Sequence, residues 1–430
     1  MKLPVDHPQR VELNDEVHAR PPEPLVAPSR LSYLALISDP AQREAGWRAV
    51  VDICTRYKTA PPEKDALHFS APLGPFRLKW EQHTEFVRFM FIVEGTTGDP
   101  FERPAISLLP EDWVAALPGQ VIVAAHAALI KAEAGPIDSR AIGNRWFDGN
   151  VPIGAAVSGG AATALTDFRI HGDGFSRHLL FDHHTTPWQA GRIIQRLLEI
   201  DTYKIMALLA LPVARSAAPM LTASGIELAK ITRSLVSADE TTEPELLNSL
   251  TRLEADVENQ QSETRYRFSA ANAYYELVQR RIDELREQRI QGLQTFREFT
   301  ERRLAPAMNT CRSIAARQES LSQRVGRATQ LLSTRVDLAR QRQNQALLAS
   351  MNSRARLQLR LQSTVEGLSV AAVTYYVSAL VGHAAEALKV EGVGVEPDLA
   401  VGISIPIVAL VAFFGIHHIR RKVTGRSGEE

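Results

Sequence analysis

The sequence predicts an α+β domain with a mixed or antiparallel sheet, followed by long coiled-coil-like helices and a C-terminal two-helix transmembrane hairpin. Strand-like and helix-like stretches alternate over residues 30–211. Strand character then disappears, and two apolar runs follow near the C-terminus. We therefore expect five segments, at residues 1–29, 30–212, 213–363, 364–418 and 419–430.

The composition gives the whole chain no electrostatic preference for nucleic acid. Lys and Arg number 49, and Asp and Glu also number 49, so the formal charges balance. Cys54 and Cys311 are far apart, which makes a disulfide framework or a cysteine zinc site implausible and fits a reducing compartment. The proline-rich segment 1–29 lacks the apolar core of a secretory signal, so we do not expect export by that route.

The elements of the α+β domain follow from periodicity and turn residues. Strands or strand pairs are predicted at residues 31–37, 76–94, 121–130, 155–168 and 175–182. The last two flank the turn 171–174, where two glycines permit a tight reversal. Helices are predicted at 41–57 and 187–211, the second with Pro187 at its start and Pro212 at its end.

Residues 226–364 are predicted to form long helices because they are rich in helix formers, and their glycines are Gly292 and Gly326. A break at 239–244 separates a first helix from a second, which runs to about residue 305, and Pro306 marks a kink or turn. A third helix then continues into the first apolar run. Apolar residues in heptad spacing predict an antiparallel coiled pair: Phe268, Ala271, Tyr275, Val278, Ile282 and Leu285, then Ile314, Leu321, Val325, Ala328 and Leu332.

Residues 302–363 are strongly basic, with twelve arginines against Glu319 and Asp337, an excess of ten positive charges. The arginines nearest the membrane, Arg354, Arg356 and Arg360, should attract anionic lipid headgroups at about 1 kcal/mol each. The more distant arginines are expected to pair with acids of the preceding helix: Glu276, Asp283, Glu284, Glu287, Glu298 and Glu301. Binding of RNA or an acidic protein is the alternative, although no aromatic residues alternate with the arginines as nucleic-acid binding would favour.

The two apolar runs, 367–385 and 399–416, predict a membrane hairpin. The first contains one ionisable residue, His383, and the second contains none. Basic residues flank the pair on its outer sides, at 354–360 and at 417–422, whereas the intervening turn carries Glu391, Glu396 and Asp398 against Lys389. The positive-inside rule then places both termini in the cytoplasm, and we expect a two-span protein of the bacterial inner membrane. The alternative is a pair of buried helices in a water-soluble protein.

One face of the first run carries small residues every three or four positions, which favours close packing against the second run or another copy of the chain. The residues of this small-residue face are Gly367, Ala371, Thr374, Ser378, Gly382 and Ala385. Tyr375 and Tyr376 lie near the middle of the run, where their hydroxyl groups need hydrogen-bond partners. An intramolecular hydrogen bond is the simpler interpretation, and a pore or inter-subunit contact is the alternative.

Three polar clusters are candidates for chemistry, at residues 14–20, 80–85 and 171–184. The third most resembles a metal site, with candidate ligands His171, Asp173, His178, Asp182 and His184. Solvated turn residues or a domain contact are the simpler explanation. The sequence contains no Walker loop, G-x-G-x-x-G, G-x-S-x-G or H-E-x-x-H motif. We therefore predict no cofactor and find no support for an enzyme.

Four separated stretches resemble a bacterial family of uncharacterised membrane-anchored proteins, domain of unknown function 3422. They are LNDEVHARPPEPL at 13–25, WEQHTEF at 80–86, TDFRIHGDGFSR at 166–177 and AGRIIQRLLEIDTYKIMALLALP at 190–212. The resemblance covers essentially the whole chain. It implies membrane anchoring but no activity, and it transfers no catalytic residues.

The predicted topology is also similar to that of the CorA-type magnesium channels, although their Gly-Met-Asn signature is missing and Gly382-His383-Ala384 stands in its place. Ten excess positive charges near the span would also repel a divalent cation. We therefore predict a homo-oligomeric structural or interaction protein, with a CorA-like ion channel as the alternative. Its expected partners are the bilayer and further copies of the chain; nucleic acid is disfavoured, and a small-molecule or ion ligand stays open.

Overall fold

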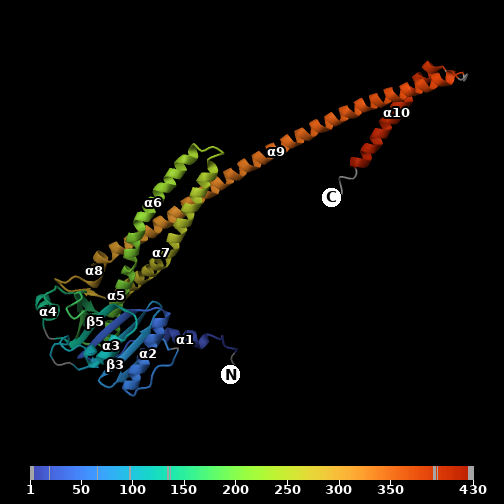
Figure 1. Ribbon diagram of the computed structural model, residues 1–430. Coiled ribbons are helices and arrows are strands. Elements are labelled where there is room, and N and C mark those ends of the chain that lie inside the picture. The colour runs from blue at the N-terminus through green and yellow to red at the C-terminus, as the bar shows by residue number, and fades with distance from the viewer. Residues whose placement is uncertain are drawn as a thin grey trace. The chain divides into compact units, whose positions relative to one another are not determined.

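The computed structural model describes residues 4–18, 20–64, 66–95, 98–132, 135, 137–390, 394 and 396–424. Within these residues, the chain forms an α+β domain with a mixed nine-stranded sheet, followed by long helices, as predicted (Figure 1). The chain divides into two compact units. The first comprises Met1–Ser237 and Glu245–Thr329, and the second comprises Ala238–Pro244 and Gln330–Glu430.

The sheet of the first unit has the strand order β2-β3-β4-β1-β5-β8-β7-β6-β9. Its neighbouring strands pair antiparallel except β5 and β8, which are parallel. The strands are β1 Ser29–Ile37, β2 His68–Leu73, β3 Phe76–Gln82, β4 Phe86–Glu94, β5 Gln120–Lys131, β6 Ile153–Val157, β7 Ala162–Thr166, β8 Ser176–Asp182 and β9 Gln288–Arg289. The strands predicted at 31–37, 121–130 and 175–182 and the strand pair predicted at 76–94 are therefore confirmed.

The two faces of the sheet differ in chemistry because alternate side chains along a strand point to opposite faces. One face carries the aromatic core, including Trp80, Phe89 and Phe91, and packs against α2 (Pro40–Arg56), η1 (Ala105–Leu108) and α3 (Glu111–Ala115). The neighbouring positions of β3 and β4 carry Glu81 and Arg88, which therefore point to the other face. Helix α5 (Pro187–Leu208) covers that second face.

Two further helices belong to this domain. Helix α4 (Ser139–Trp146) adds a smaller core in which Trp146 and Phe147 pack with Leu179 of β8 and with Leu293. Helix α1 (Arg10–His18) lies in the proline-rich N-terminal segment.

The stretch 155–168 was predicted as one strand, but it forms the hairpin β6–β7. The amide of Gly160 donates to the carbonyl of Val157 at 3.1 Å, and the two residues between them, Ser158 and Gly159, have φ of 53° and 73°. Two successive positive φ values define the turn that best matches the twist of paired strands. The prediction missed this hairpin because alanines continue on both sides of the turn.

Pro212 does not end a helix as predicted. Helix α5 ends at Leu208, and α6 (Ala210–Val236) begins two residues later. Pro212 therefore lies in the first turn of α6, where no intrahelical bond needs its missing amide hydrogen.

The second long helix ends twenty residues earlier than predicted. Helix α7 (Glu243–Leu285) stops before Arg286 and Gly292, which have φ of 50° and 85°. Between them, β9 joins the edge of the sheet beside β6. Helix α8 (Phe296–Arg303) follows, and Thr295 and Glu298 form a capping box at its start. Pro306, predicted at a kink or turn, lies in the first turn of α9 (Ala305–Val390), directly after the break between α8 and α9 at Leu304.

Helices α6, α7 and the first part of α9 contact one another within the first unit. Gln260 of α7 donates to the carbonyl of Ala217 of α6 at 3.4 Å, and Thr264 of α7 donates to Gln318 of α9 at 3.1 Å. Several residues of the predicted heptads are buried: Ala271, Val278, Ile282, Leu285, Ile314, Leu321, Val325 and Leu332. The coiled-coil interpretation of these positions stays a prediction.

Three of the acids predicted to pair with the arginines of residues 302–363 pair with other arginines instead. Asp283 pairs with Arg297, Glu284 with Arg196 and Arg281, and Glu298 with Arg289. These acids lie at the end of α7 and in the following turn and α8, which fold back beside the sheet. Among the twelve arginines, Arg335 pairs with Glu243.

The second unit contains most of α9 and α10 (Pro397–Thr424). The small-residue face of α9 lies toward α10: a Cβ atom on Gly382 would approach Cγ2 of Val401 to 2.8 Å, and Ser378 and Ala385 are buried. Part of the predicted flanking charge lies outside the described residues, namely residue 391, residues 425–430 and the side chains of 389 and 419–424.

Candidate functional site

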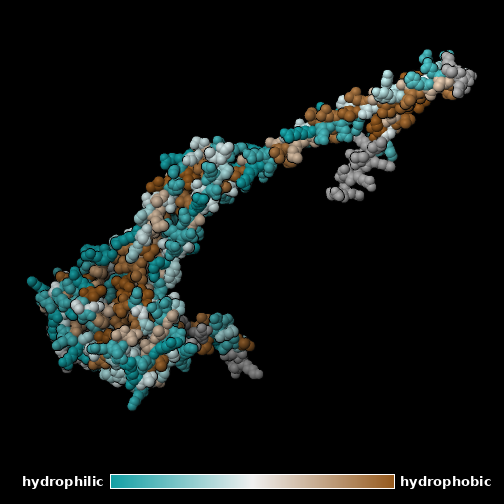
Figure 2. Space-filling view, in the orientation of Figure 1, coloured by the Kyte–Doolittle hydropathy of each residue, from teal (hydrophilic) through white to brown (hydrophobic). Residues whose placement is uncertain are grey.

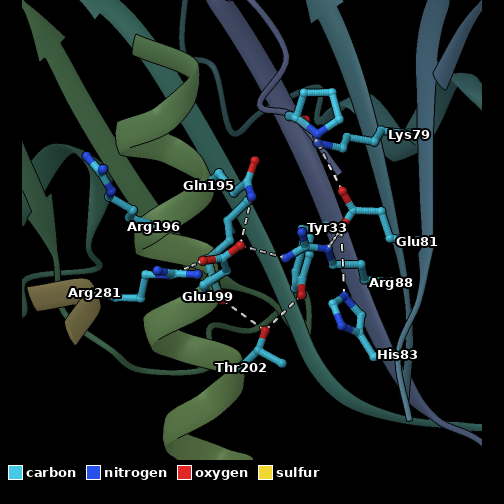
Figure 3. A network of polar contacts seen from close by, with 12 residues as sticks. Tyr33, Lys79, Glu81, His83, Arg88, Gln195, Arg196, Glu199, Thr202 and Arg281 are labelled. Carbon is cyan, nitrogen blue, oxygen red and sulfur yellow. Dashed lines mark hydrogen bonds and ion pairs between the residues drawn. The ribbon is translucent and has the colours of Figure 1, made fainter. Parts of the chain in front are cut away.

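A network of charged side chains lies between the sheet and α5 (Figure 3). Lys79 and Glu81 come from β3, Arg88 from β4, Glu199 from α5 and Arg281 from α7. Lys79, Glu81, Arg88 and Glu199 are each less than 5% exposed. Charges are rarely buried to this degree unless they are paired, so the contacts of each group matter.

On the sheet, Glu81 is the acceptor for several groups. It lies directly opposite Arg88 in the β3–β4 register, and Nε of Arg88 donates to it. Nζ of Lys79 lies 3.0 Å from Oε1 of Glu81 and also donates to the carbonyl of Pro21. Nε2 of His83 is 3.7 Å from Oε2 of the same carboxylate.

Arg88 also links the sheet to α5. Its Nη1 donates to Oε1 of Glu199 at 3.2 Å, and Nε2 of Gln195 donates to the same oxygen at 2.8 Å. Nε of Arg281, on α7, donates to the other oxygen of Glu199. A single carboxylate of α5 therefore joins β4 to α7.

The network continues outward from Arg281. Nη1 of Arg281 is 3.1 Å from both carboxylate oxygens of Glu284, and Nε of Arg196 donates to Glu284 at 3.0 Å. Glu284 is a third exposed at its side chain. The network thus runs from the buried sheet face to the surface between α5 and α7.

A second polar cluster surrounds Asp201, two residues further along α5. Its Oδ2 accepts from Oγ of Ser176 at 2.8 Å and lies 3.2 Å from Nε2 of His178, while Nζ of Lys204 donates to Oδ1 at 2.6 Å. Nearby, the hydroxyl groups of Tyr33 and Thr202 are 2.8 Å apart. Both clusters attach α5 to strands by side-chain contacts.

The electrostatics of these groups favour fixed charges over proton transfer. Burial alone would raise the pKa of Glu81 and of Glu199, but the charge of Arg88 lowers both pKa values overall. Two further buried groups lie on the same elements: burial raises the pKa of Tyr203 on α5 to about 12 and lowers the pKa of His126 on β5 to about 4. At neutral pH these carboxylates are therefore ionised and His126 is neutral, so none of them is poised as a general acid or base.

The four stretches that carry the family resemblance meet around α5. The first contributes the carbonyl of Pro21 to Lys79, and the backbone of Glu23 lies against Gly191. The second contains Glu81, and the third contributes Ser176 to Asp201. The fourth is α5 itself together with the start of α6. Segments as far apart in the sequence as Glu23 and Gly191, which are 168 positions apart (191 − 23), thus form one contact region.

The metal-ligand candidates occupy separate contacts. Nδ1 of His171 lies 2.8 Å from Asp148 and its Nε2 3.2 Å from Asp167, whereas His178 contacts Asp201 and Asp182 pairs with Lys131. Asp173 lies 3.8 Å from Arg177, and the backbone amide of His184 donates to Ala161. Among the described residues, no three His, Cys, Asp or Glu side chains are arranged to hold a metal ion.

The other two polar clusters differ in the contacts that their side chains form. The cluster at 80–85 contributes Glu81 and His83 to the buried network, and Glu85 accepts a two-pronged bond from Arg267 of α7 at 2.7 and 3.2 Å. In the cluster at 14–20, Arg20 donates to the carbonyl of Gln82 at 3.5 Å, while residue 19 and the side chains of 16 and 18 lie outside the described part of the chain.

A pattern in the sequence does indicate the network: charged residues interrupt apolar elements. Arg88 interrupts the apolar strand FVRFMFIVE, and Glu199 and Asp201 interrupt the apolar helix segment LLEID. A charge in the middle of a buried element needs a partner, which predicts pairing between these elements.

The chain matches the family model described as "Protein of unknown function (DUF3422)" over residues 5–423. No curated protein and no solved structure matches it. The family resemblance is therefore confirmed, whereas the similarity to CorA-type channels stays a prediction.

Proposed function

The chain belongs to this family of proteins of unknown function, and from that premise we propose that it is a membrane-anchored, homo-oligomeric binding or scaffold protein. In this proposal the end of α9 and α10 cross the bacterial inner membrane, and the first unit works in the cytoplasm. The observation that carries this proposal is that the apolar side chains of these two helices are mostly exposed among the described residues.

Three described helical stretches are long and apolar enough to cross a membrane, and they differ in how far they are buried. The most apolar window is 11% buried in Ala305–Leu388 and 0% buried in Pro397–His418. Figure 2 shows hydrophobic residues gathered over the end of α9 and over α10. A water-soluble protein seldom exposes so continuous an apolar surface, so lipid is the solvent that fits these two helices.

The third stretch, Pro187–Val236, has a different explanation. Its window is 33% buried, and it combines α5, which packs on the sheet, with α6, which packs on α7. Glu199 and Asp201 of α5 are paired with groups of the first unit. Moving α5 into lipid would break these pairs, so we assign this stretch to the first unit.

The charges beside the two apolar helices support cytoplasmic termini. Arg354, Arg356 and Arg360 precede the first, and Glu396 and Asp398 lie between the two. The three arginines are exposed, so they are free to meet anionic headgroups.

Homo-oligomerisation is supported by polar side chains of α9 that form no hydrogen bond with the described residues. The small-residue face is used by α10, because Gly367, Ala371, Thr374 and Ser378 line a groove with Val401 and Ile405. Tyr375 and Tyr376 are 70% and 68% exposed, and their hydroxyl groups form no hydrogen bond with any described residue. In hydrocarbon such groups need partners, which further copies of the chain can supply.

The anchoring part of the proposal is tested by extracting membranes with alkaline carbonate and by fusing a periplasm-active reporter to the C-terminus. We expect the protein in the pellet and the reporter inactive. The double variant Leu410→Arg/Val411→Arg should block insertion of α10, because an arginine at mid-span costs about 2.5–3.5 kcal/mol, and should activate the reporter.

The matched control is Leu347→Arg/Leu348→Arg, at exposed positions of α9 before the first apolar run. It should leave the reporter inactive. Recovery of the unaltered chain in the carbonate supernatant would contradict anchoring, and an active reporter on that chain would contradict cytoplasmic termini.

A further inference from the structure

An open groove of about 450 Å³ lies between the start of α5 and the end of α7. Four arginines line it, Arg192 and Arg196 from α5 with Arg280 and Arg286 from the end of α7, together with Asp283 and Glu284. The groove belongs entirely to the first unit and adjoins the outer end of the buried charge network. Its lining residues are charged or polar.

The carboxylates of the groove are already engaged. Asp283 pairs with Arg297, and Glu284 pairs with Arg196 and with Arg281. In contrast, the guanidinium groups of Arg192, Arg280 and Arg286 are exposed and form no hydrogen bond or ion pair with any described residue. Four arginines and two carboxylates therefore line one groove, which leaves it a net positive charge, and three of the arginines are not directly paired.

Helix stabilisation accounts for only part of this arrangement. Arg280 and Arg286 lie near the C-terminus of α7, where a positive charge interacts favourably with the helix dipole. Arg192 lies in the second turn of α5, far from a helix C-terminus, so the same argument does not apply. Like charges brought together repel each other, and an anion between them would remove that cost.

We propose that this groove binds a compact phosphate-bearing anion. Guanidinium groups bind phosphate by paired, charge-assisted hydrogen bonds. The hydroxyl of Ser158 and the side-chain amide of Gln189 also line the groove and have no partner among the described residues, so they add neutral donors. Among the described residues, no aromatic side chain lines the groove, and its size suits a small ligand, which disfavours a nucleobase or a macromolecule.

Binding there would also act on the network. Arg196 and Glu284 line both this groove and a smaller cavity of about 170 Å³ that reaches Glu199. An anion held by Arg192, Arg196 and Arg280 would connect α5 to α7 beside the pairs that already join them. The inference goes beyond the proposed membrane anchoring and does not depend on it.

The test uses the full-length protein in a non-ionic detergent and isothermal titration calorimetry at low salt. Inorganic pyrophosphate is the probe in one arm, and the water-soluble short-chain lipid dihexanoyl phosphatidic acid is the probe in the other. We expect binding with a Kd below about 1 mM. The variant Arg192→Gln/Arg280→Gln should weaken it by about tenfold or more, because each arginine contributes charge-assisted bonds.

The matched control is Arg252→Gln, since Arg252 is exposed on the same α7 and lies outside the groove. It should leave the Kd unchanged. Binding of pyrophosphate supports a soluble phosphate ligand, and binding of the lipid alone supports a headgroup. Absence of binding in both arms, or equal weakening by Arg252→Gln, would overturn the proposal. The binding experiment uses protein in detergent, so its outcome does not depend on whether the chain is anchored in a membrane.

Discussion

Arg88 and Glu199 show at the residue scale why the network holds the first unit together. Each is almost fully buried, and each contacts groups from two other elements. A buried ion pair adds little net stability compared with apolar residues, but removal of one partner leaves an uncompensated buried charge. The network therefore specifies how α5 and α7 attach to the sheet.

Replacement of Glu199 tests this role. We expect Glu199→Gln to lower the free energy of unfolding of the first unit by about 3–5 kcal/mol, because Arg88 and Arg281 both lose their carboxylate. Urea denaturation followed by tryptophan fluorescence measures it, since all five tryptophans lie in the first unit. The exposed acid Glu227 is the control, and an equal effect of Glu227→Gln would contradict a specific role for the network.

The same carboxylates determine a pH dependence. The pKa values of Glu81 and Glu199 are lower in the folded chain than in ordinary carboxyls. Their stabilisation is therefore fully present well above the unfolded pKa of about 4.3 and is lost as the pH falls through that value toward the folded pKa values. In Glu199→Gln the loss of stability between about pH 5 and pH 3 should be smaller than in the unaltered chain. Equal slopes would show that Glu199 is not held ionised by the network.

At the element scale, α5 is the centre of the first unit. It covers the sheet, carries Glu199 and Asp201, and receives the N-terminal segment at its first turns. The amide of Leu25 donates to the carbonyl of Pro187 at 2.9 Å, and the carbonyl of Glu23 occupies the place where a Cβ atom of residue 191 would lie. Glycine at this position permits the backbone contact.

Gly191→Ala should therefore detach the N-terminal segment from α5. The added methyl group meets backbone atoms, and overpacking of this kind costs about 1–3 kcal/mol. Limited proteolysis should show faster cleavage before Leu25 together with a lower urea midpoint. Gly225→Ala on α6 is the control, because no atom of the described residues lies within 4 Å of its Cβ position, and alanine there should stabilise the helix by about 1 kcal/mol. Unchanged cleavage in Gly191→Ala would show that the segment is not held by this contact.

At the scale of the whole molecule, the two units differ in how far their apolar side chains are buried. The first unit buries its apolar residues among its own elements, whereas α9 and α10 of the second leave most of theirs uncovered. The exposed side of α9 carries Tyr376, which does not line the groove beside α10, while its buried side carries Ala385. If copies of the chain associate through the spans, these two positions should differ in their contacts between copies.

Cysteine crosslinking in native membranes measures that difference. Tyr376→Cys should give a disulfide-linked dimer on mild oxidation, and Ala385→Cys should give much less because Ala385 is only 4% exposed. The natural cysteines, Cys54 and Cys311, are buried and should contribute little background. A monomer in Tyr376→Cys would contradict association through this side of α9.

Local patterns in the sequence determined most elements, since alternation predicted β1, β5 and β8 and an apolar run of sufficient length predicted the end of α9. The ordered motifs determined the family. Only the tertiary structure decided where α7 ends, because a positive φ at Arg286 depends on the return of the chain to the edge of the sheet. It also decided which charges meet: the distance in sequence from Arg88 to Glu199 is 111 residues, and no local pattern encodes a contact that depends on strand order and helix placement.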